Sequence, residues 1–392
     1  MKILHLSTDE QFVDHAFPVF ESVYPGGNEV FIFSINKFLT NTNLKPDYIE
    51  SSRKYRISSK AKLGEDIYSR YDLIVFHSLN SSIYPELANI PDDTPTLWLG
   101  WGFDYYDDFL NHNSLLLKKT QCLYKNIELT GPKRFANNLL KKLMNHLLYK
   151  RRKLRAIERL TVFSPVLPKE YEMVRKSHNW RQFPKYGAWN YGTIEDNFIN
   201  GFKNQTVSGD CILVGNSATY TGNHLEAFDL LVNIRDNDRK VVVPLSYGEP
   251  PLAKKLVLVG EGLFSDNFEP LTDFMPIQDY VNIIRKCGFV IMNHIRQQAI
   301  GNIVIMLYLG ARVFLRMENP AYDFFKKMGV VISTVQELEA QQELLDIPLT
   351  TDERTKNREL VSEYWSRDKS ISRTKKLIEF ATREEEDIIL SN

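Results

Sequence analysis

The fold of this chain is decided by residues 287–328, CGFVIMNHIRQQAIGNIVIMLYLGARVFLRMENPAYDFFKKM. The stretch predicts an apolar strand over 288–293, then a polar loop and a helix over 303–309. Gly310 follows, and a second strand is predicted over 311–316. A glycine directly after a helix favours the left-handed position that ends it, and strands this apolar are typical of a parallel sheet covered on both faces. The stretch therefore predicts a βαβ unit.

The polar loop of this unit, residues 294–302, is a predicted anion site. Open α/β sheets bind ligands at the carboxyl ends of their strands, which is where this loop lies. Arg296 supplies a guanidinium, Gly301 allows a ligand close to the backbone, and the helix start supplies N–H groups. The alternative for the arginine is a solvated loop residue. We predict that a phosphate or diphosphate binds here, with Arg296, Gln297, Gln298, Gly301 and Asn302 as its contacts.

The segment after the second strand is predicted to add a carboxylate to the same edge. Asn319 is suited to cap a helix and Pro320 to occupy its first turn, and the helix is expected to run through Met328. Glu318 is thereby held beside the loop, where it could accept hydrogen bonds from sugar or ribose hydroxyls. The alternative is an ordinary loop acid.

Composition limits the classes of function. With 392 residues, 43% of them hydrophobic, the chain is long enough for two domains. Lys and Arg number 49, as do Asp and Glu, so the net charge gives no overall attraction to nucleic acid. Three distant cysteines exclude a disulfide framework and a thiolate zinc cluster. No signal peptide and no membrane-spanning run is recognised, so we expect a soluble or peripheral protein on the cytoplasmic side.

The expected organisation is two α/β domains, each a Rossmann-like doubly wound sheet. Apolar runs separated by helix-length segments predict parallel strands at 1–6, 30–33, 73–76 and 96–99. The expected boundaries are 1–192 for the first domain, 193–209 for a polar linker, 210–350 for the second domain and 351–392 for charged C-terminal helices.

Three candidate catalytic residues follow strands of the first domain and are expected at one sheet edge. In order of preference they are Asp104, Asp9 and His77. A histidine near carboxylates is suited to act as a general base, although the alternative for His77 is a hydrogen-bonded structural histidine. Asp104 follows the aromatic Trp101-Gly102-Phe103, and aromatic faces beside an acid are typical of carbohydrate sites.

A basic amphipathic helix is predicted between residues 132 and 160. This segment has ten Lys or Arg residues and a single acid, Glu158, and its leucines recur at helical spacing. Such a helix can lie on an anionic membrane surface, whereas the alternative is a helix that packs on its own domain with a solvated basic face. The predicted membrane-surface residues are Lys141, Lys142, Lys150, Arg151, Arg152 and Lys153, and no nucleic-acid partner is predicted.

The second domain opens with another predicted phosphate loop. A strand over 211–214 is followed by Gly215-Asn216-Ser217, which offers many hydrogen-bond donors but lacks the lysine of a P-loop. The next strand leads into Pro244 and Tyr247, which we add to the predicted donor site. Two doubly wound domains with phosphate loops only in the second indicate a nucleotide-sugar enzyme of the GT-B type.

The same motifs carry a resemblance to a known family. The chain resembles glycosyltransferase family 56 in the following motifs: Trp101-Gly102-Phe103-Asp104-Tyr105-Tyr106, Gly215-Asn216-Ser217, Val243-Pro244, Arg296-Gln297-Gln298 with Gly301, and Glu318-Asn319-Pro320. The resemblance implies a GT-B fold and transfer of an N-acetylfucosamine-like deoxy-amino sugar (Fuc4NAc) from a dTDP-sugar to an undecaprenyl-diphosphate-linked oligosaccharide (lipid II). It also implies a role in bacterial surface polysaccharide synthesis, namely enterobacterial common antigen, and a peripheral position on the inner membrane.

One departure concerns two glutamates, eight positions apart, that larger retaining GT-B families have before the glycine that ends this helix. Gln297 and Ile305 stand there in this chain, so Glu318 is the substitute candidate. We expect Arg296 and the two loops to stabilise the leaving diphosphate without a metal or cofactor. The alternatives are a nucleotide-sugar epimerase, another GT-B enzyme with a soluble acceptor, or a non-catalytic nucleotide-sugar-binding protein.

Overall fold

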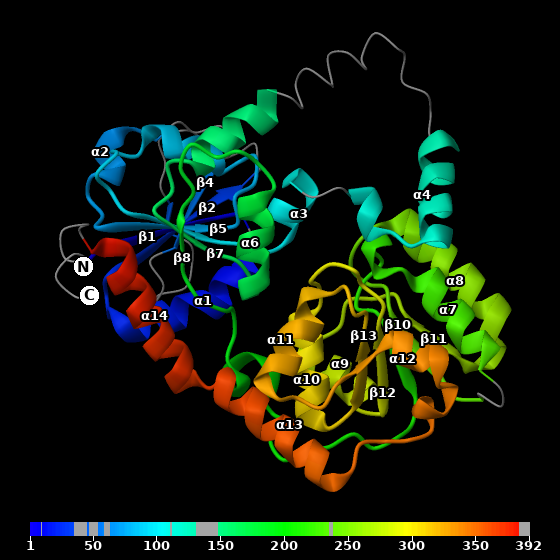
Figure 1. The fold of residues 1–392 in the computed structure, drawn as a ribbon. Helices are drawn as coiled ribbons and strands as arrows, with labels where there is room; N and C mark the ends of the chain where they lie inside the picture. Colours follow the sequence, from blue (N-terminus) through cyan, green and yellow to red (C-terminus); the bar gives the residue numbers. More distant parts are fainter. Residues whose placement is uncertain are drawn as a thin grey trace. The chain divides into compact units, whose positions relative to one another are not determined.

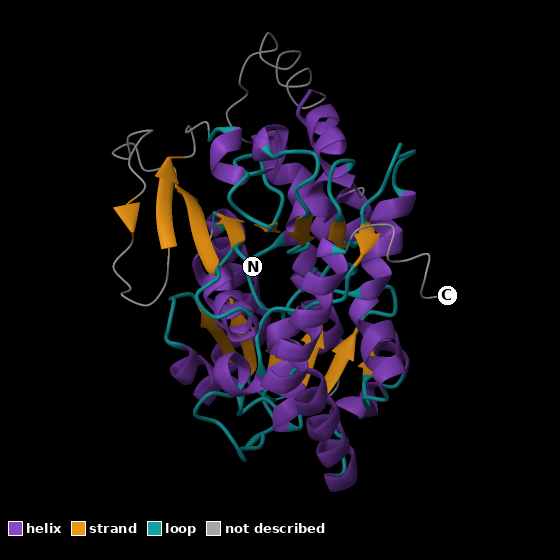
Figure 2. Cartoon of the chain, turned by 90° about the vertical axis from the view of Figure 1, so that its left-hand side faces the viewer, coloured by secondary structure: helices purple, strands orange, loops and turns teal. Residues whose placement is uncertain are grey.

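The computed structural model describes residues 1–8, 10–34, 45–46, 54–58, 63–109, 112–130, 148–234 and 238–383. The chain divides into two compact units. Unit 1 consists of described residues within 1–110, 134–193 and 366–392, and unit 2 of those within 111–133 and 194–365. Each unit contains one sheet with helices around it (Figures 1 and 2).

Unit 1 is built on a sheet with the strand order β3-β4-β2-β1-β5-β6-β7-β8. All neighbouring strands pair in parallel except β3 and β4. The chain reverses its direction of winding between β1 and β5, which is where such sheets bind ligands. The strands are β1 (Ile3–Ser7), β2 (Asn28–Ser34), β3 (Lys45–Pro46), β4 (Lys54–Ser58), β5 (Leu73–His77), β6 (Thr96–Leu99), β7 (Val162–Ser164) and β8 (Lys185–Tyr186).

The helices of unit 1 cover both faces of this sheet, so every residue of β1 and β5 is buried. Phe20 of α1 and Leu377 and Ile378 of α14 pack into one apolar cluster with the strands, and α1 lies beside α14 (Figure 1). The helices are α1 (Glu10–Val23), α2 (Glu65–Tyr68), α3 (Phe103–Phe109), α6 (Pro168–Lys176), α14 (Arg367–Thr382) and a helix whose described part spans 148–157.

Unit 2 is built on a parallel sheet with the order β11-β10-β9-β12-β13-β14. This is the doubly wound order of dinucleotide-binding sheets, with the reversal of winding between β9 and β12. The strands are β9 (Ile212–Val214), β10 (Val241–Pro244), β11 (Phe268–Leu271), β12 (Phe289–Met292), β13 (Arg312–Leu315) and β14 (Ser333–Thr334).

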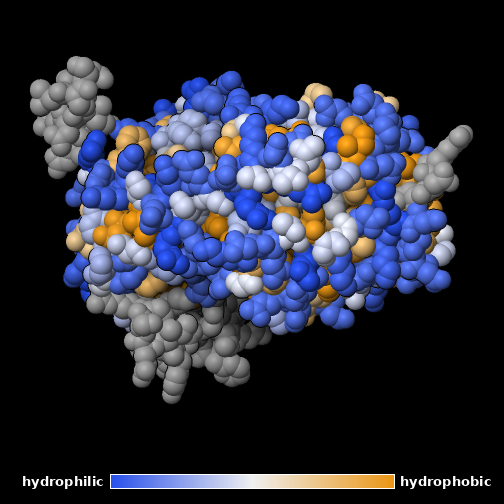
Figure 3. Space-filling view, turned by 90° about the horizontal axis from the view of Figure 1, so that it is seen from below, coloured by the Kyte–Doolittle hydropathy of each residue, from blue (hydrophilic) through white to orange (hydrophobic). Residues whose placement is uncertain are grey.

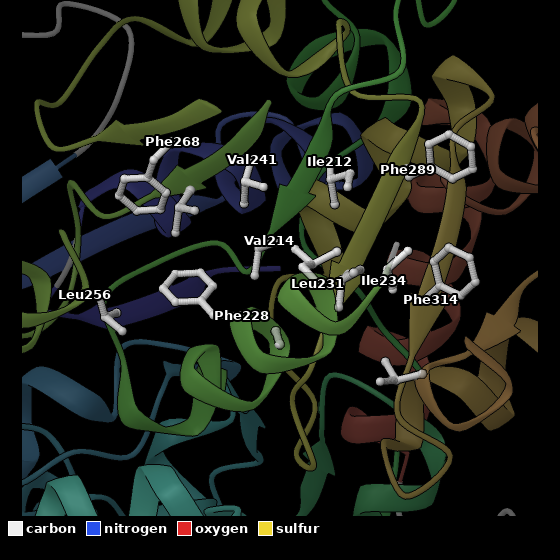
Figure 4. Close-up of a cluster of buried hydrophobic side chains, with 14 of the residues drawn as sticks. Ile212, Val214, Phe228, Leu231, Ile234, Val241, Leu256, Phe268, Phe289 and Phe314 are labelled. Atoms are coloured by element: carbon white, nitrogen blue, oxygen red, sulfur yellow. The ribbon is translucent and has the colours of Figure 1, made fainter. Parts of the chain in front are cut away.

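The core of unit 2 lies between this sheet and its helices. Phe228 and Leu231 of α7 meet Val214 and Phe268 of the strands in a close-packed cluster (Figure 4). The helices are α4 (Lys118–Thr130), α7 (His224–Asn233), α8 (Pro250–Phe264), α9 (Ile277–Ile284), α10 (Ile300–Leu309), α11 (Pro320–Met328), α12 (Val335–Ala340) and α13 (Thr351–Tyr364).

The βαβ unit predicted from residues 287–328 is present. Gly310 ends α10 with a φ of 88°, the left-handed conformation expected of it. Asn319 caps α11 by accepting a hydrogen bond from the amide of Ala321, and Pro320 opens the helix. The start of α10 differs, at Ile300 instead of residue 303, and both strands are one residue shorter at each end than predicted.

The division into units differs from the expected boundaries at three places. α14 packs in unit 1, although residues 351–392 were expected to follow the second domain. α4 lies in unit 2, where Leu123 packs against the core. Residues 194–209 of the expected linker are part of unit 2, and the side chain of Phe202 in this segment is buried.

The surface shows no broad apolar area on the face drawn in Figure 3, where hydrophobic residues stand singly or in small groups. Within the described part of the chain, no helix combines the length and apolar character that crossing a bilayer requires.

Two glycines of α8 provide a matched test of packing in unit 2. A Cβ on Gly260 would lie 2.1 Å from the ring of Phe268, whereas one on Gly262 would meet nothing within 4 Å. We expect Gly260→Ala to lower the free energy of unfolding by roughly 1–3 kcal/mol through overpacking. Gly262→Ala should raise it by roughly 0.5–1 kcal/mol through helix propensity. Urea unfolding measures both, and similar effects of the two changes would contradict this packing.

Candidate functional site

The side chain of Gln298 joins the loops after β9 and β12. Its Nε2 lies 3.0 Å from Asn216 Oδ1, 3.2 Å from Ser217 Oγ and 2.8 Å from Thr219 Oγ1. Its Oε1 accepts a hydrogen bond from Thr221 Oγ1 at 2.8 Å. Since β9 and β12 flank the reversal of winding, these contacts bring the two predicted phosphate loops together at the edge where ligands bind.

Gly215 allows the β9 loop to turn over a buried histidine. Its φ is +67°, and a Cβ there would lie 2.5 Å from His224 Nε2. Its amide donates to the carbonyl of Ile291 in β12 at 3.0 Å. A side chain at this position would therefore push the loop away from the neighbouring strand, which explains the glycine.

Two histidines lie buried beneath these loops. Neither ring nitrogen of His294, nor Nε2 of His224, has a hydrogen-bond partner among the described residues. Burial lowers the pKa of His224 to about 4. Burial, together with the nearby His224 and the positive Arg296, lowers the pKa of His294 to about 3. Both rings are therefore neutral at physiological pH.

The first turn of α10 is suited to receive an anion. Ala299 precedes it with a φ of 63°, no side chain caps it, and the turn contains no acid. Uncapped N–H groups at a helix start carry a partial positive charge. Arg296 is half-buried in the preceding loop, where its Nε donates to the carbonyl of Gln297 at 3.3 Å.

Three predicted contacts in this loop have structural roles. Asn302 donates to the hydroxyl of Tyr280 in α9 at 3.1 Å. Gln297 is buried. A Cβ on Gly301 would lie 3.4 Å from the ring of Phe198, so this glycine faces protein side chains. The ligand contacts expected at Asn302 and Gly301 stay predictions.

The end of β13 supplies an arginine that the sequence argument missed. The guanidinium of Arg316 is nearly buried and contacts Asn293 Oδ1 at 3.2 Å, Glu318 at 3.3 Å and Glu339 at 3.4 Å. The sequence feature that could have identified Arg316 is a charged residue directly after an apolar strand. Because two carboxylates pair with this guanidinium, Arg316 adds no net positive charge to the edge, and it connects the β12 loop to the segments that carry Glu318 and Glu339.

Glu318 lies at the predicted edge and is already hydrogen-bonded. Its Oε2 accepts from Gln336 at 2.8 Å and from Arg316. Burial alone would raise the pKa of Glu318, but its own backbone amide, Gln336 and the charge of Arg316 outweigh burial and lower it. The carboxylate is therefore ionised, and its proposed contact with sugar hydroxyls stays a prediction.

Hydrogen bonds from asparagine side chains to backbone carbonyls connect the remaining loops. Asn319 donates to the carbonyl of His294 at 3.0 Å. Asn293 donates to the carbonyl of Asn223 at 2.9 Å, and Asn223 donates back to the carbonyl of Asn293 at 3.2 Å. Both Asn319 and Asn223 are fully buried, so Asn319 acts as a structural support in place of the ligand contact we expected.

The residues predicted after β10 lie on the other side of the β9 loop. Pro244 is buried in the sheet as the last residue of β10. Tyr247 is 77% exposed and lines a pocket of about 620 Å³ with Leu245, Leu258 and Thr272. This pocket lies at the ends of β10 and β11. The carbonyl of Tyr247 accepts a hydrogen bond at 2.7 Å from the amide of Ala218, which lies between two partners of Gln298, so Tyr247 is tied to the β9 loop.

Asp104, the first catalytic candidate of unit 1, has a structural role. Asp104 is buried, and its carboxylate accepts hydrogen bonds from the amides of Leu79 and Trp101 and from Trp98 Nε1, at 2.8–2.9 Å. Burial raises the pKa of Asp104, against the opposing charge of Lys153 and these hydrogen bonds. The carboxylate holds the turn after β6, in place of the accessible base that we expected.

Of the other two catalytic candidates, the structure describes only His77. Asp9 lies outside the described residues. His77 is fully buried between His5 and Tyr191, with ring nitrogens 2.9 Å from His5 Nδ1 and 2.8 Å from the Tyr191 hydroxyl. Burial lowers the pKa of His77 well below its usual value. The structure thus agrees with the alternative of a hydrogen-bonded structural histidine.

The basic helix is only partly a surface feature. Lys153 is buried, donates to the carbonyl of Asp104 at 2.5 Å and forms an ion pair with Asp108, so its assignment to the membrane surface was wrong. Lys150 is half-buried, whereas Arg151 and Arg152 are exposed. Lys141 and Lys142 lie outside the described residues. Within the described part of the chain, no three His, Cys, Asp or Glu side chains gather as a metal site.

Solved structures with the same fold are known glycosyltransferases. The chain is similar to alpha,alpha-trehalose 6-phosphate synthase from Burkholderia multivorans, with 10% identity, a TM-score of 0.60 and 99% of each chain covered. It is also similar to HepE from Anabaena in complex with UDP, with 13% identity and a TM-score of 0.60 over 96% of this chain and 98% of that one. A glycosyltransferase from Rickettsia africae matches with 12% identity and a TM-score of 0.61, over 98% of this chain and 99% of that one.

These similarities define the class of fold as GT-B. The model of a sequence family, 4-alpha-L-fucosyltransferase glycosyl transferase group 56, matches residues 188–347. This range includes the loops after β9, β12 and β13. The resemblance to glycosyltransferase family 56 is confirmed over this range, and the chain is a glycosyltransferase.

The buried histidines predict how stability depends on pH. Below pH 6.5 the unfolded chain protonates His224 and His294, while the folded chain keeps them neutral down to about pH 4 and about pH 3. The unfolded state then binds more protons, so the free energy of unfolding should fall with pH from 6.5 to 4, by about 1.4 kcal/mol per pH unit for each histidine. Urea unfolding between pH 7 and pH 4.5 measures this slope.

The variant His294→Leu removes one of these groups and should flatten the slope. His178→Gln is the matched control, because His178 is only partly buried and burial lowers its pKa less. Parallel pH curves for wild type and His294→Leu would show that His294 does not remain neutral in the folded protein.

Proposed function

We propose that this glycosyltransferase moves a Fuc4NAc-like deoxy-amino sugar from a dTDP-sugar to an undecaprenyl-diphosphate-linked oligosaccharide. The observation that carries the proposal is the family match, which spans the junction of the β9 and β12 loops at Gln298. HepE, which has the same fold, was solved in complex with UDP. That complex supports a nucleoside diphosphate as the leaving group here.

The donor diphosphate is proposed to lie between the first turn of α10, Arg296 and the β9 loop. The uncapped amides of α10 and the guanidinium can stabilise the negative charge that develops as the bond to the anomeric carbon breaks. The acceptor hydroxyl attacks that carbon as its bond to the diphosphate oxygen breaks, and the proton of the hydroxyl passes to the leaving diphosphate or to water. Ser217 and Asn216, held by Gln298, would supply further hydrogen bonds.

Arg296→Ala tests the donor site. We expect it to weaken dTDP binding by about 10- to 100-fold, because a hydrogen bond to a charged group contributes roughly 1.5–3 kcal/mol. The readouts are the thermal shift produced by dTDP, with UDP, GDP and ADP as comparisons, and the release of dTDP from dTDP-Fuc4NAc. Lys254→Ala is the control, since Lys254 is exposed and lies on α8.

The outcomes separate the alternatives. Unchanged dTDP binding by Arg296→Ala would remove this residue from the site. Binding of dTDP without any consumption of a dTDP-sugar would identify a nucleotide-sugar-binding protein. Conversion of the dTDP-sugar without an acceptor would identify an epimerase, and transfer to a soluble saccharide alone would exclude the lipid-linked acceptor.

We further propose a peripheral position on the cytoplasmic face of the inner membrane. Support comes from the exposed Arg151, Arg152 and Arg155, which lie within a segment rich in Lys and Arg. Each cation near an anionic membrane contributes on the order of 1 kcal/mol. Replacing all three with Ala should therefore weaken sedimentation with phosphatidylglycerol-containing liposomes by about a hundredfold.

The control for this experiment is the pair Lys375→Ala and Lys376→Ala, exposed cations on α14 of the same unit. Binding by wild type should fall with salt and be absent for phosphatidylcholine liposomes. Equal losses in the control and in the arginine variant would point to nonspecific attraction and contradict the proposed surface.

A further inference from the structure

The direction of the Gln298 carboxamide follows from its hydrogen-bond partners. Its nitrogen faces three oxygens of the β9 loop, and its oxygen faces the hydroxyl of the buried Thr221. Reversing the carboxamide would place its oxygen 3.0 Å from Asn216 Oδ1, and neither of these two atoms has a hydrogen to donate. Gln298 therefore donates to the β9 loop and accepts from Thr221.

This direction decides which polar groups the β9 loop can offer to a ligand. Thr219 Oγ1 accepts from Gln298 at 2.8 Å, so the hydroxyl of Thr219 keeps its own hydrogen for another partner. Asn216 Oδ1 accepts from Gln298 and lies 3.5 Å from Ser217 Oγ, so the amide nitrogen of Asn216 points away from both. The oxygens of Thr219 and Asn216 thus already receive hydrogens, and what these side chains still offer is donors.

Thr219 carries the accessible hydroxyl of this loop. Thr219 is half-buried, whereas Ser217 is 2% exposed. Among the described residues, one acceptor lies within reach of the Thr219 hydroxyl, namely Ser217 Oγ at 3.4 Å, which is longer than an ordinary O–H···O hydrogen bond. The hydrogen of Thr219 is therefore available to a ligand. It lies beside Gln298, two residues before α10 begins.

The hydrogen bonds of this network run in one direction. Thr221 donates to Gln298, and Gln298 donates to Thr219. Consecutive hydrogen bonds polarise one another, so a carboxamide that accepts at its oxygen donates more strongly at its nitrogen. The hydroxyl of Thr219 is polarised in the same sense. Because hydrogen bonds to charged oxygens are about twice as strong as neutral ones, the end of this network favours an anion over a neutral hydroxyl.

We propose that the hydroxyl of Thr219 donates a hydrogen bond to the diphosphate of the sugar donor, and that Gln298 is the positioning residue that directs this hydroxyl. The inference rests on the proposed function, which places the diphosphate between the β9 loop and the first turn of α10. It adds Thr219 as a contact of the diphosphate. It also explains why a glutamine suits position 298, because a glutamate there would draw the hydrogen of Thr219 to its own carboxylate.

Thr219→Val tests the contact. We expect it to weaken dTDP binding by about 10- to 100-fold, because valine keeps the shape of threonine but loses a hydrogen bond to a charged group. Isothermal titration calorimetry of the full chain measures this, with inorganic pyrophosphate as a second probe that lacks the nucleoside. Thr355→Val is the matched control, since Thr355 is an exposed threonine on α13 of the same unit. Equal affinities of the two variants would overturn the proposal.

Gln298→Glu tests the positioning role. The carboxylate has the shape of the carboxamide but no hydrogen to donate, so dTDP binding should weaken by about tenfold or more. In this background Thr219→Val should have little further effect, because the hydroxyl already points at the carboxylate. Charge repulsion alone would leave the effect of Thr219→Val undiminished, and that result would remove Gln298 as a positioning residue. Gln298→Met closes the same cycle without a charge if dTDP binding by the glutamate variant is too weak to measure.

The two probes separate this inference from the proposed function. Binding of dTDP that does not depend on Thr219 would overturn the contact and leave the proposed donor in place. Binding of pyrophosphate that depends on Thr219, without binding of dTDP, would support the contact and remove the proposed donor. A wild-type protein that binds neither probe would overturn both.

Discussion

The side-chain carboxamide of Gln298 joins the two loops of the candidate donor site, beside the hydrogen bonds exchanged by Asn223 and Asn293. Gln298 offers two amide hydrogens to three oxygens of the β9 loop and accepts from Thr221, so each loop fixes the conformation of the other. Gln298 is half-buried, so water can replace part of what its loss would remove. The contact is possible only because β9 and β12 are neighbours in the sheet. The strand order therefore determines the site.

The parts of the fold that could be predicted are those with local signals. The bounds of α11 follow from Asn319 and Pro320, and the end of α10 follows from Gly310, because capping and left-handed geometry depend on a few adjacent residues. The placement of α14 in unit 1 could not be predicted in this way. Its apolar side chains are specified only by their packing against α1 and the strands, which are distant in sequence.

The same limit explains the errors at the candidate sites. Helical periodicity placed Lys153 with the other cations, but its partners Asp104 and Asp108 lie 45 or more positions away in the chain. Asp104 followed an aromatic turn, as many sugar-binding acids do, yet its three hydrogen-bond donors come from β6, the turn after it and the loop after β5. Whether a polar residue faces solvent or supports a turn depends on such partners.

Each unit carries a pair of buried histidines near the carboxyl edge of its sheet. In unit 1 the pair is His5 and His77, and in unit 2 it is His224 and His294. Burial lowers the pKa of all four, so neither edge gains a charge from imidazole at neutral pH. The positive charge beside the β12 loop must then come from arginine, which stays protonated at any physiological pH.

The two sheets share the same doubly wound order, so topology alone does not assign a ligand to either unit. The side chains at the two edges make the difference. A diphosphate requires N–H donors and cations, which unit 2 supplies through the start of α10 and Arg296. The chemistry of the edge of unit 2 therefore favours a nucleotide there.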